Sequence, residues 1–252
     1  MKIEVAAIDM DETLLGEDGK VSGSTSDVLQ HWLRSGRRLV IATGRPTRIV
    51  GEALPKFLHN VPWISYKGAA IHEQGAQIFS DCLSPELGRE IVEYLQAMMP
   101  GCGIGMEVDG ELHLNRATER ARNYRVVDLS TLFERPAAKI LCFGIETPVM
   151  RTVLAQTPAG SRAILSDKVH FAQIMTESAD KAHALDFLVN RWGLSLANVI
   201  AFGDDINDTE MVRRVGMGVA MENAAEQVKA VAKRIAPHHK EDGVAQVLQS
   251  LL

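Results

Sequence analysis

The sequence predicts an α/β protein whose core is a parallel β-sheet, with a separate α+β region inserted into it. Short apolar runs of the length of a buried strand alternate with segments in which apolar residues recur at helical spacing. Between residues 83 and 177 this alternation gives way to hairpin-like pairs of strands. We therefore expect a core formed by residues 1–82 and 178–252 and an inserted α+β region formed by residues 83–177.

The composition is that of a globular protein with one large domain, or with a domain that carries a sizeable insertion. The chain has 252 residues, and 46% of them are hydrophobic, which is enough for a core. A net charge of -5 argues against sequence-independent binding to nucleic acid or to an anionic membrane. The odd number of widely spaced cysteines, at positions 82, 102 and 142, is typical of reduced thiols, so we expect a cytoplasmic protein.

The first predicted strand, Val5 to Ile8, ends in two carboxylates, Asp9 and Asp11. Two acids at the end of a buried strand repel each other and lose hydration, so a cation has to compensate them. Magnesium is the simplest candidate, because it prefers oxygen ligands and keeps positions for water and phosphate. From these residues alone, an acidic turn or a calcium-type loop explains the pattern equally well.

A helix and a second strand follow. Ser24, with Asp27 three positions later, resembles a helix-capping arrangement, and Gly36 is well placed to end the helix. Arg38 to Ala42 then has the composition of a strand. The order of strand, helix and strand predicts that this strand pairs in parallel with the first.

The second strand ends in Thr43, Gly44 and Arg45, and ligands of open α/β sheets bind beyond the carboxyl ends of the strands. Thr43 offers a hydroxyl donor, and Gly44 lets the backbone approach a phosphate closely. A plain strand-to-helix turn with a permissive glycine explains the same residues. The apolar segment from Pro62 to Ile71 follows, with a hairpin turn predicted around Glu73 to Ala76.

The inserted region is predicted to mix helices with strands. Helices are predicted over Pro85–Met98 and Pro148–Ala155, with a further helical segment near Thr118–Tyr124. Strands are predicted over Ile104–Asp109, Glu111–Asn115, Ala138–Ile145, Arg162–Leu165 and His170–Met175. The arginines between Arg116 and Arg125 either form a solvated face or contact a ligand.

The core resumes at Lys181, in the first turn of a helix that ends at Gly193. A lysine at this end opposes the helix dipole, so it has to gain something else, such as the neutralisation of a phosphate and of the two strand-end carboxylates. A solvated lysine is the alternative. The next strand, Asn198 to Phe202, runs into Gly203-Asp204-Asp205-Ile206-Asn207-Asp208, and so many acids behind a glycine are hard to explain without a cation.

The last part of the chain repeats the pattern of helices and strands. Its elements are predicted over Asp208–Val215, Met217–Met221, Ala224–Ala232, near Ile235 and from Gly243. The adjacent His238 and His239 suggest a metal site, but neighbouring histidines on a short loop do not easily face one ion. We therefore expect a surface loop there.

Four of these segments resemble the motifs of the haloacid dehalogenase (HAD) superfamily of phosphohydrolases. They are Asp9-Met10-Asp11-Glu12-Thr13 for D-x-D-x-T, Val40–Pro46, the segment around Lys181, and Gly203–Asp208 for G-D-x-x-N-D. Ala182 replaces the glycine that usually follows the third-motif lysine. Lys67 stands where Cof-type members commonly have an asparagine that faces the active site, so it either adds positive charge over the substrate or points to solvent.

The resemblance implies a Rossmann-like core with an inserted class IIB cap. It implies that Asp9 is the nucleophile, that Asp11 is the general acid and base, and that Mg²⁺ is the cofactor. The residues expected at the metal are Asp9, Asp11 through its backbone carbonyl, Asp204 and, as an orienting residue, Asp208. The residues expected at the substrate phosphate are Met10, Thr43, Gly44, Arg45, Lys181 and Asn207.

The function implied is magnesium-dependent hydrolysis of small phosphomonoesters, such as sugar phosphates or phosphorylated cofactors, through an aspartyl-phosphate intermediate. A sugar phosphomutase of the same superfamily and a non-catalytic binder of phosphorylated metabolites stay open as alternatives. A binder needs neither nucleophile nor acid, so the presence of both Asp9 and Asp11 argues against it. The expected partner is a small phosphomonoester, without nucleic acid or membrane, and the expected protein is a monomer or homodimer.

Overall fold

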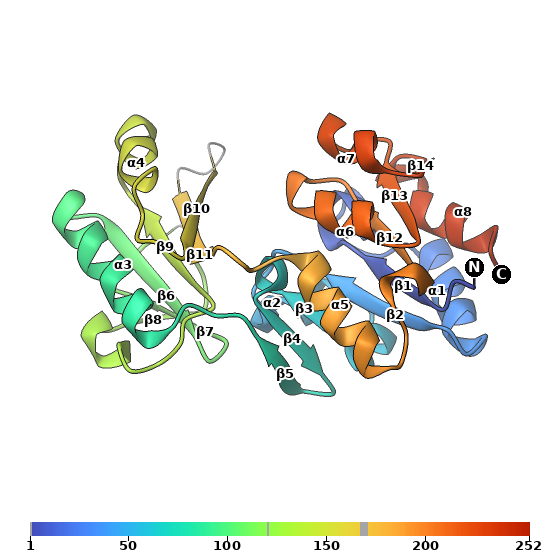
Figure 1. Ribbon diagram of the computed structural model, residues 1–252, viewed down its shortest axis with the longest axis horizontal. Helices are drawn as coiled ribbons and strands as arrows, with labels where there is room; N and C mark the ends of the chain where they lie inside the picture. Colours follow the sequence, from blue (N-terminus) through green and yellow to red (C-terminus); the bar gives the residue numbers. More distant parts are fainter. Residues whose placement is uncertain (1, 120, 167–170) are drawn as a thin grey trace. The chain divides into compact units, whose positions relative to one another are not determined.

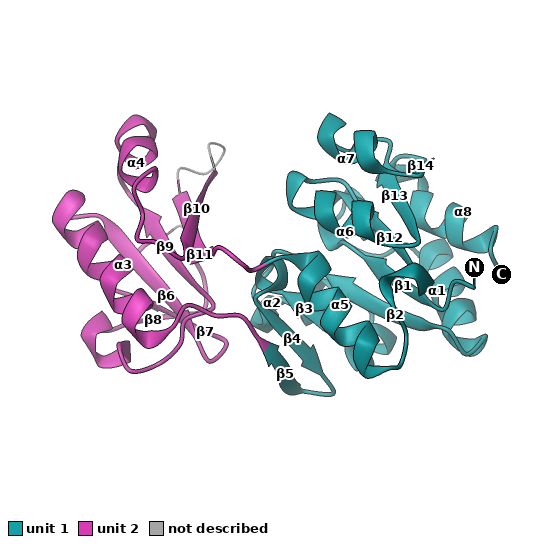
Figure 2. Ribbon diagram, in the orientation of Figure 1, with its two compact units in different colours: residues 1–79, 180–252 teal, residues 80–179 magenta. Residues whose placement is uncertain are grey.

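The computed structural model of the protein describes residues 2–119, 121–166 and 171–252. The chain divides into two compact units, Met1–Phe79 with Asp180–Leu252 as the first and Ser80–Ala179 as the second (Figure 2). The second unit is thus inserted into the sequence of the first. Within the described residues, no helix is both long and apolar enough to cross a membrane.

The first unit is built on an eight-stranded sheet with the order β14-β13-β12-β1-β2-β3-β4-β5 (Figure 1). Its strands are β1 (Val5–Ile8), β2 (Arg38–Ala42), β3 (Trp63–Ser65), β4 (Ala70–Glu73), β5 (Ala76–Ser80), β12 (Val199–Gly203), β13 (Met217–Met221) and β14 (Arg234–Ala236). Pairing is parallel from β14 to β3, and β4 then runs antiparallel to β3. Strand β1 lies between β2 and β12, and each of its residues is buried, as expected for a strand that is covered on both faces.

Helices cover both faces of this sheet. They are α1 (Gly23–Arg34), α2 (Thr47–Ala53), α5 (Lys181–Arg191), α6 (Thr209–Arg214), α7 (Glu226–Val231) and α8 (Gly243–Gln249). Because successive side chains of a strand point to opposite faces, β1 contributes Ala6 and Ile8 to one hydrophobic cluster and Val5 and Ala7 to another. The first cluster includes residues of α1 and α8, and the second includes residues of α5.

Short helical turns follow the strands at the sheet edge where the predicted motifs lie. The turn after β1 is η1 (Met10–Leu14), the one after β3 is η3 (Tyr66–Gly68), and the one after β12 is η6 (Ile206–Asp208). Further turns are η2 (Lys56–Asn60), η4 (Leu129–Leu132), η5 (Leu196–Asn198) and η7 (His239–Glu241). Helix α1 is capped by Ser22, whose side chain accepts a hydrogen bond from Thr25 N, so the expected cap at Ser24 is wrong by two residues.

The second unit packs helices on a six-stranded sheet with the order β10-β11-β9-β6-β7-β8. Its strands are β6 (Gly103–Val108), β7 (Glu111–Leu114), β8 (Tyr124–Val126), β9 (Lys139–Phe143), β10 (Ser161–Ser166) and β11 (Phe171–Thr176). Its helices are α3 (Pro85–Met98) and α4 (Thr147–Leu154). Ile91 of α3 and Met150 of α4 share a hydrophobic cluster with Ile104 of β6 and Ile140 of β9, so both helices pack on the same face of the sheet.

The helical segment predicted near Thr118–Tyr124 is not found among the residues that the structure describes there. Tyr124 instead begins β8, which pairs in parallel with β7, and its hydroxyl hydrogen-bonds the backbone of Thr118. Pairing with a neighbouring strand has thus overridden the local helical pattern. Arg120, and His170 of the strand predicted over His170–Met175, lie outside the described residues.

Candidate active site

The carboxyl ends of β1 and β12 bring Asp9 and Asp204 together. The two strands are parallel neighbours, with Ile8 opposite Phe202, and Asp9 N donates to Phe202 O at 3.1 Å. Asp208 follows in η6, and carboxylate oxygens of Asp9, Asp204 and Asp208 all lie within 4.8 Å of one another. Residues that are almost 200 positions apart in the sequence therefore form one buried acidic cluster.

Lys181 is the cation inside this cluster. Its side chain is 1% exposed, and its Nζ donates to Asp9 Oδ1 at 2.5 Å and to Asp208 Oδ1 at 2.6 Å. Asp180 caps helix α5 by accepting hydrogen bonds from Ala182 N and His183 N, which fixes Lys181 in the first turn. Two carboxylates thus compensate the unfavourable position of a lysine at the positive end of a helix.

Asp208 also holds the loop that follows β12. Its Oδ2 accepts hydrogen bonds from Asp204 N and Asp205 N, both at 3.1 Å. A Cβ on Gly203 would lie 2.4 Å from Asp208 Cβ, so only glycine leaves room for this carboxylate. Both oxygens of Asp208 are therefore engaged by protein donors, which makes Asp208 an orienting residue for the cluster.

Burial and mutual repulsion perturb the charges of the cluster. Burial raises the pKa of Asp9 well above its ordinary value and the neighbouring carboxylates add to this, while Lys181 opposes it. Burial likewise raises the pKa of Asp204 to about 7, although a hydrogen bond from Thr13 works against the shift. For Lys181, burial lowers the pKa, but Asp208 and Asp9 outweigh it and raise the pKa above the ordinary value.

The cluster has the donor set of a site for a hard divalent cation. Three buried carboxylates face one ammonium group, so the cluster carries excess negative charge. Carboxylate oxygens are the ligands that Mg²⁺ prefers, and one or two of them suffice when water and phosphate complete the shell. Because Asp208 is engaged by Lys181 and by backbone amides, Asp9 and Asp204 are the side chains best placed to hold the ion.

Asp11 lies in η1 and is paired with Arg45, which follows β2. Arg45 Nε donates to Asp11 Oδ2 at 2.9 Å, and Arg45 Nη2 donates to Asp11 Oδ1 at 2.5 Å. The Asp11 side chain is 56% exposed. The hydroxyl of the buried Thr43 accepts a hydrogen bond from Arg45 N at 3.1 Å, which places the expected phosphate-binding turn next to the expected acid.

Three further residues complete the comparison with the sequence-based expectations. Met10 is fully buried with its side chain in the hydrophobic core, so it offers only its backbone to a ligand. Asn207 Oδ1 is buried and has no hydrogen-bond partner among the described residues. A buried oxygen without a protein partner is typical of a position that binds a water or a ligand. Thr13, which the sequence analysis did not single out, donates to Asp204 Oδ1 at 2.7 Å; its place in the same short motif as Asp9 was the available signal.

Comparison with known proteins identifies the family of the chain. The model of the haloacid dehalogenase-like hydrolase family matches residues 6–248. The chain belongs to this family. The family and the α/β fold class that the sequence predicts are thereby confirmed, and the protein is a phosphatase-type hydrolase.

Relatives of this hydrolase are similar over nearly its whole length. The 5-amino-6-(5-phospho-D-ribitylamino)uracil phosphatase YitU of Bacillus subtilis is 26% identical over 257 residues, which are 96% of this chain and 95% of the relative. The crystal structure of a haloacid dehalogenase-like hydrolase from Bacteroides thetaiotaomicron has a TM-score of 0.87 at 26% identity and covers 100% of both chains. A HAD subclass IIB sugar phosphatase shares the fold, with a TM-score of 0.82 at 21% identity over 98% of each chain.

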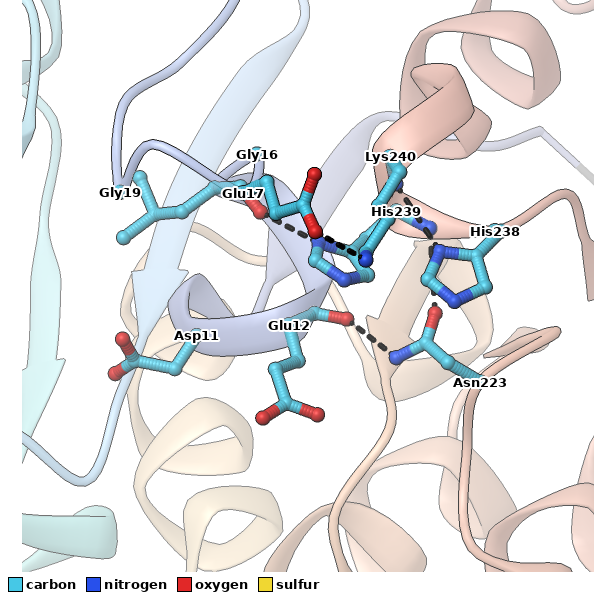
Figure 3. Close-up of a pocket in the computed structure, with 10 residues that line it drawn as sticks. Asp11, Glu12, Gly16, Glu17, Gly19, Asn223, His238, His239 and Lys240 are labelled. Atoms are coloured by element: carbon cyan, nitrogen blue, oxygen red, sulfur yellow. Dashed lines mark hydrogen bonds and ion pairs between the residues drawn. The ribbon is translucent and has the colours of Figure 1, made fainter.

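A pocket of about 470 Å³ in this hydrolase lies beside η1 (Figure 3). It is lined by Asp11, Glu12, Leu15, Gly16, Glu17, Gly19, Asn223, His238, His239 and Lys240. Asn223 Nδ2 donates to Glu12 O at 2.8 Å, and His239 Nδ1 lies 2.8 Å from Leu15 O, so this wall supports the turn that carries Asp11. Among the described residues, neither His238 nor His239 belongs to a group placed to hold a metal ion.

Proposed function

We propose that the protein is a magnesium-dependent phosphatase of small phosphomonoesters that works through an aspartyl-phosphate intermediate. The observation that carries the proposal is the buried carboxylate of Asp9, 2.5 Å from the ammonium of Lys181 and next to Asp204. Lys181 contacts Oδ1 of Asp9, which leaves the carboxylate a second oxygen for bond formation with phosphorus. The family of the chain and its phosphatase relatives support this reading.

In the first step, an oxygen of Asp9 attacks the phosphorus and the bond to the ester oxygen breaks. Asp11 gives its proton to the departing alcohol. In the second step it takes a proton from the water that attacks the phosphorus, so the bond from phosphorus to the oxygen of Asp9 breaks and inorganic phosphate is released. Arg45 is hydrogen-bonded to both oxygens of Asp11. We therefore propose that Arg45 leaves Asp11 for the substrate phosphate, which frees a carboxyl oxygen of Asp11 to contact the ester oxygen.

The remaining site residues bind and orient the phosphoryl group. Mg²⁺, held by Asp9, Asp204 and the backbone carbonyl of Asp11, would supply positive charge at the phosphoryl oxygens. Thr43 and the amide of Gly44 donate hydrogen bonds to these oxygens, and Lys181 adds its charge. The Oδ1 of Asn207, which has no partner among the described residues, accepts a hydrogen bond from water at the site. Asp208 keeps the ammonium of Lys181 in place through the contact at 2.6 Å.

The substrate class follows from the relatives by analogy. The substrate named for YitU carries its phosphate on a ribityl group, so we propose phosphate monoesters of sugars, of sugar alcohols or of cofactors that contain them. We also propose a cytoplasmic location, where free thiols such as those of Cys82, Cys102 and Cys142 stay reduced.

The test is phosphate release from a panel of phosphomonoesters, with and without magnesium, for the wild type and for Asp9→Asn. We expect the substitution to lower kcat by about three orders of magnitude or more, because it removes the nucleophile. Asp27→Asn, which changes an exposed acid on helix α1 of the same unit, is the matched control and should retain wild-type activity.

Phosphatase activity, the aspartyl-phosphate intermediate and the need for magnesium are each contradicted by a different result. Absence of phosphate release by the wild type from every ester contradicts phosphatase activity, and full activity of Asp9→Asn contradicts the aspartyl-phosphate. Activity that persists in a chelator contradicts the need for magnesium. If the protein converts a hexose 1-phosphate to the hexose 6-phosphate faster than it releases free phosphate, the result favours a sugar phosphomutase.

A further inference from the structure

The turn η3 is attached to the proposed phosphate-binding turn after β2. Tyr66 N donates to Arg45 O at 3.0 Å, and Lys67 N donates to Thr43 O at 3.1 Å. Two backbone hydrogen bonds thus fix the position of η3 against the segment that carries the hydroxyl of Thr43. The side chain of Lys67 therefore starts from a defined point at the edge of the site.

The same turn abuts the start of helix α5. A Cβ on Gly68 would lie 2.3 Å from the carbonyl carbon of Asp180 and 2.7 Å from Lys181 N, so the two backbones touch. Gly68 also has a φ of 107°, which favours glycine. The turn is thus held between the two segments that supply Thr43 and Lys181, the residues proposed to bind the phosphoryl group.

The side chain of Lys67 lies across Gly44. A Cβ on Gly44 would be 3.3 Å from Lys67 Cγ and 3.4 Å from Lys67 Cε. Gly44 is not among the residues with positive φ, so its backbone conformation does not require glycine. The absence of a side chain at Gly44 therefore makes room for the stem of Lys67, in addition to allowing a ligand to approach the backbone.

Lys67 adopts a backbone conformation that is unfavourable for lysine. Its φ is 56°, and the preceding Tyr66 has a φ of 51°; both values lie in the left-handed region. Residues other than glycine are disfavoured there, and asparagine is among those best tolerated. Strained residues of this kind concentrate at functional sites, where the surrounding structure fixes them.

We propose that the ammonium of Lys67 binds the phosphoryl group of the substrate on the Gly44 side of the site. The charge of the site supports this, because Lys181 and Arg45 together contact three carboxylates and a phosphomonoester brings up to two further negative charges. Lys67 is then a substrate-binding residue that the four sequence motifs do not contain. The inference rests on the proposed function, since it assigns Lys67 to the same phosphate site.

The test is the affinity for inorganic phosphate in the presence of magnesium, measured by isothermal titration calorimetry. Lys67→Asn removes the ammonium and keeps a residue that tolerates the left-handed turn, and we expect it to raise Kd at least about tenfold, as loss of a charge-assisted hydrogen bond does. Lys67→Arg should recover most of the affinity. Lys56→Asn, an exposed lysine of the short helix η2, is the matched control and should bind phosphate as the wild type does.

A second pair of variants tests the contact with Gly44. Gly44→Ala introduces a Cβ against the stem of Lys67, and we expect it to weaken phosphate binding. In a Lys67→Ala background this Cβ meets no stem, so the additional effect of Gly44→Ala should be several-fold smaller. Circular dichroism verifies that each variant is folded.

The outcomes separate this inference from the proposed function. If Lys67→Asn binds phosphate with the same affinity as the wild type, the inference is wrong, while the proposal that the protein is a phosphatase still stands. A wild type that does not bind phosphate also overturns it. If phosphate binding depends on Lys67 and the wild type still hydrolyses no ester, the inference holds and the proposed function fails.

Discussion

Each unit of the protein buries a lysine, and the two lysines have different surroundings. Lys181 of the first unit is 1% exposed and contacts two carboxylates beyond the ends of parallel strands. Lys139 of the second unit is 5% exposed, begins β9, and donates to the amide oxygen of Gln173 on the neighbouring strand β11 at 3.0 Å. In the antiparallel pairing of β9 with β6, the residue directly opposite Lys139 is Glu107.

The difference follows from the topology of the two sheets. The carboxyl ends of neighbouring parallel strands meet at one edge, so polar residues after β1, β2 and β12 converge there. In the mostly antiparallel sheet of the second unit, neighbouring strand ends point in opposite directions, so a polar residue meets its cross-strand partners instead. A buried charge at the shared strand ends of the first unit therefore indicates a functional site. A buried charge in the second unit does not indicate one without further evidence.

Replacement of Lys181 by methionine should have the largest effect. It leaves Asp9 and Asp208 buried without their cation, and we expect a loss of about 3–5 kcal/mol in the free energy of unfolding. The variant also loses a positive charge at the phosphoryl group, and we expect kcat to fall by about two to three orders of magnitude. Chemical denaturation and steady-state kinetics measure the two effects separately.

Lys139→Met is the matched control for this comparison, because it removes a buried lysine of the same size from the other unit. We expect it to lower stability while kcat on saturating substrate stays within about tenfold of the wild type. If Lys139→Met abolishes turnover in a folded protein, or if Lys181→Met retains turnover, the assignment of a catalytic role to Lys181 and a structural role to Lys139 is wrong.

Asp204→Asn should reveal how much the acidic cluster depends on a cation. The folded-state pKa of Asp204 is about 7 against an ordinary value of 3.8, so ionisation of this carboxylate destabilises the fold progressively as pH rises from about 4 to 7. In a chelator at pH 8, Asp204→Asn should therefore be more stable than the wild type, by up to about 4 kcal/mol. An excess of magnesium equal to about 100 times Kd should stabilise the wild type by about 2.7 kcal/mol and the variant much less.

Thermal unfolding with and without magnesium, at pH 5 and pH 8, measures both parts of this prediction. In the variant, Thr13 can donate to the amide oxygen of the new asparagine as it does to the carboxylate of Asp204, so the loop is expected to keep its conformation. Equal stabilisation of both proteins by magnesium would place the ion elsewhere. A variant that is less stable than the wild type in chelator would show that Asp204 is compensated by the protein alone.

Much of the core could be predicted from the sequence because buried parallel strands leave a strong pattern. The apolar runs before Asp9, Thr43 and Asp204 correspond to β1, β2 and β12, and the polar residues after them lie at one sheet edge. The helix predicted over Pro85–Met98 has the same bounds in the structure, because Ser84 and Pro85 mark its start. These signals are local, and a single sequence contains them.

The remaining features depend on contacts between distant residues. The bidentate pair of Arg45 with Asp11, and the stem of Lys67 on Gly44, join segments more than 20 positions apart and have no local pattern. The cap of α1 was misplaced because Ser22 and Ser24 are equally good caps in isolation. Ser22 is selected by its hydrogen bond to Asp242, which only the folded chain supplies.

The hydrogen bond between Ser22 and Asp242 leads to the prediction with the smallest expected effect. This prediction compares a helix cap in the first unit with one in the second. Ser22 Oγ accepts from Thr25 N at 3.0 Å and also donates to Asp242 Oδ1 at 2.7 Å, whereas the exposed Ser84 Oγ accepts from Leu87 N at 3.2 Å. Ser22→Ala should therefore lower the free energy of unfolding by about 1–2 kcal/mol, and Ser84→Ala by about 0.5–1 kcal/mol.

Urea denaturation of both variants measures these costs, with separate transitions for the two units if they unfold independently. Ser22→Ala tests more than a cap, because Ser22 also donates to Asp242, the residue immediately before α8. Thr25 Oγ1 donates to the same oxygen at 3.0 Å. The interaction of Ser22 with Asp242 joins the first helix of the chain to the last. Equal costs for the two serines would mean that this link adds nothing to the cap, and that the hydrogen bond from Thr25 and the apolar contacts suffice to hold the C-terminal helix.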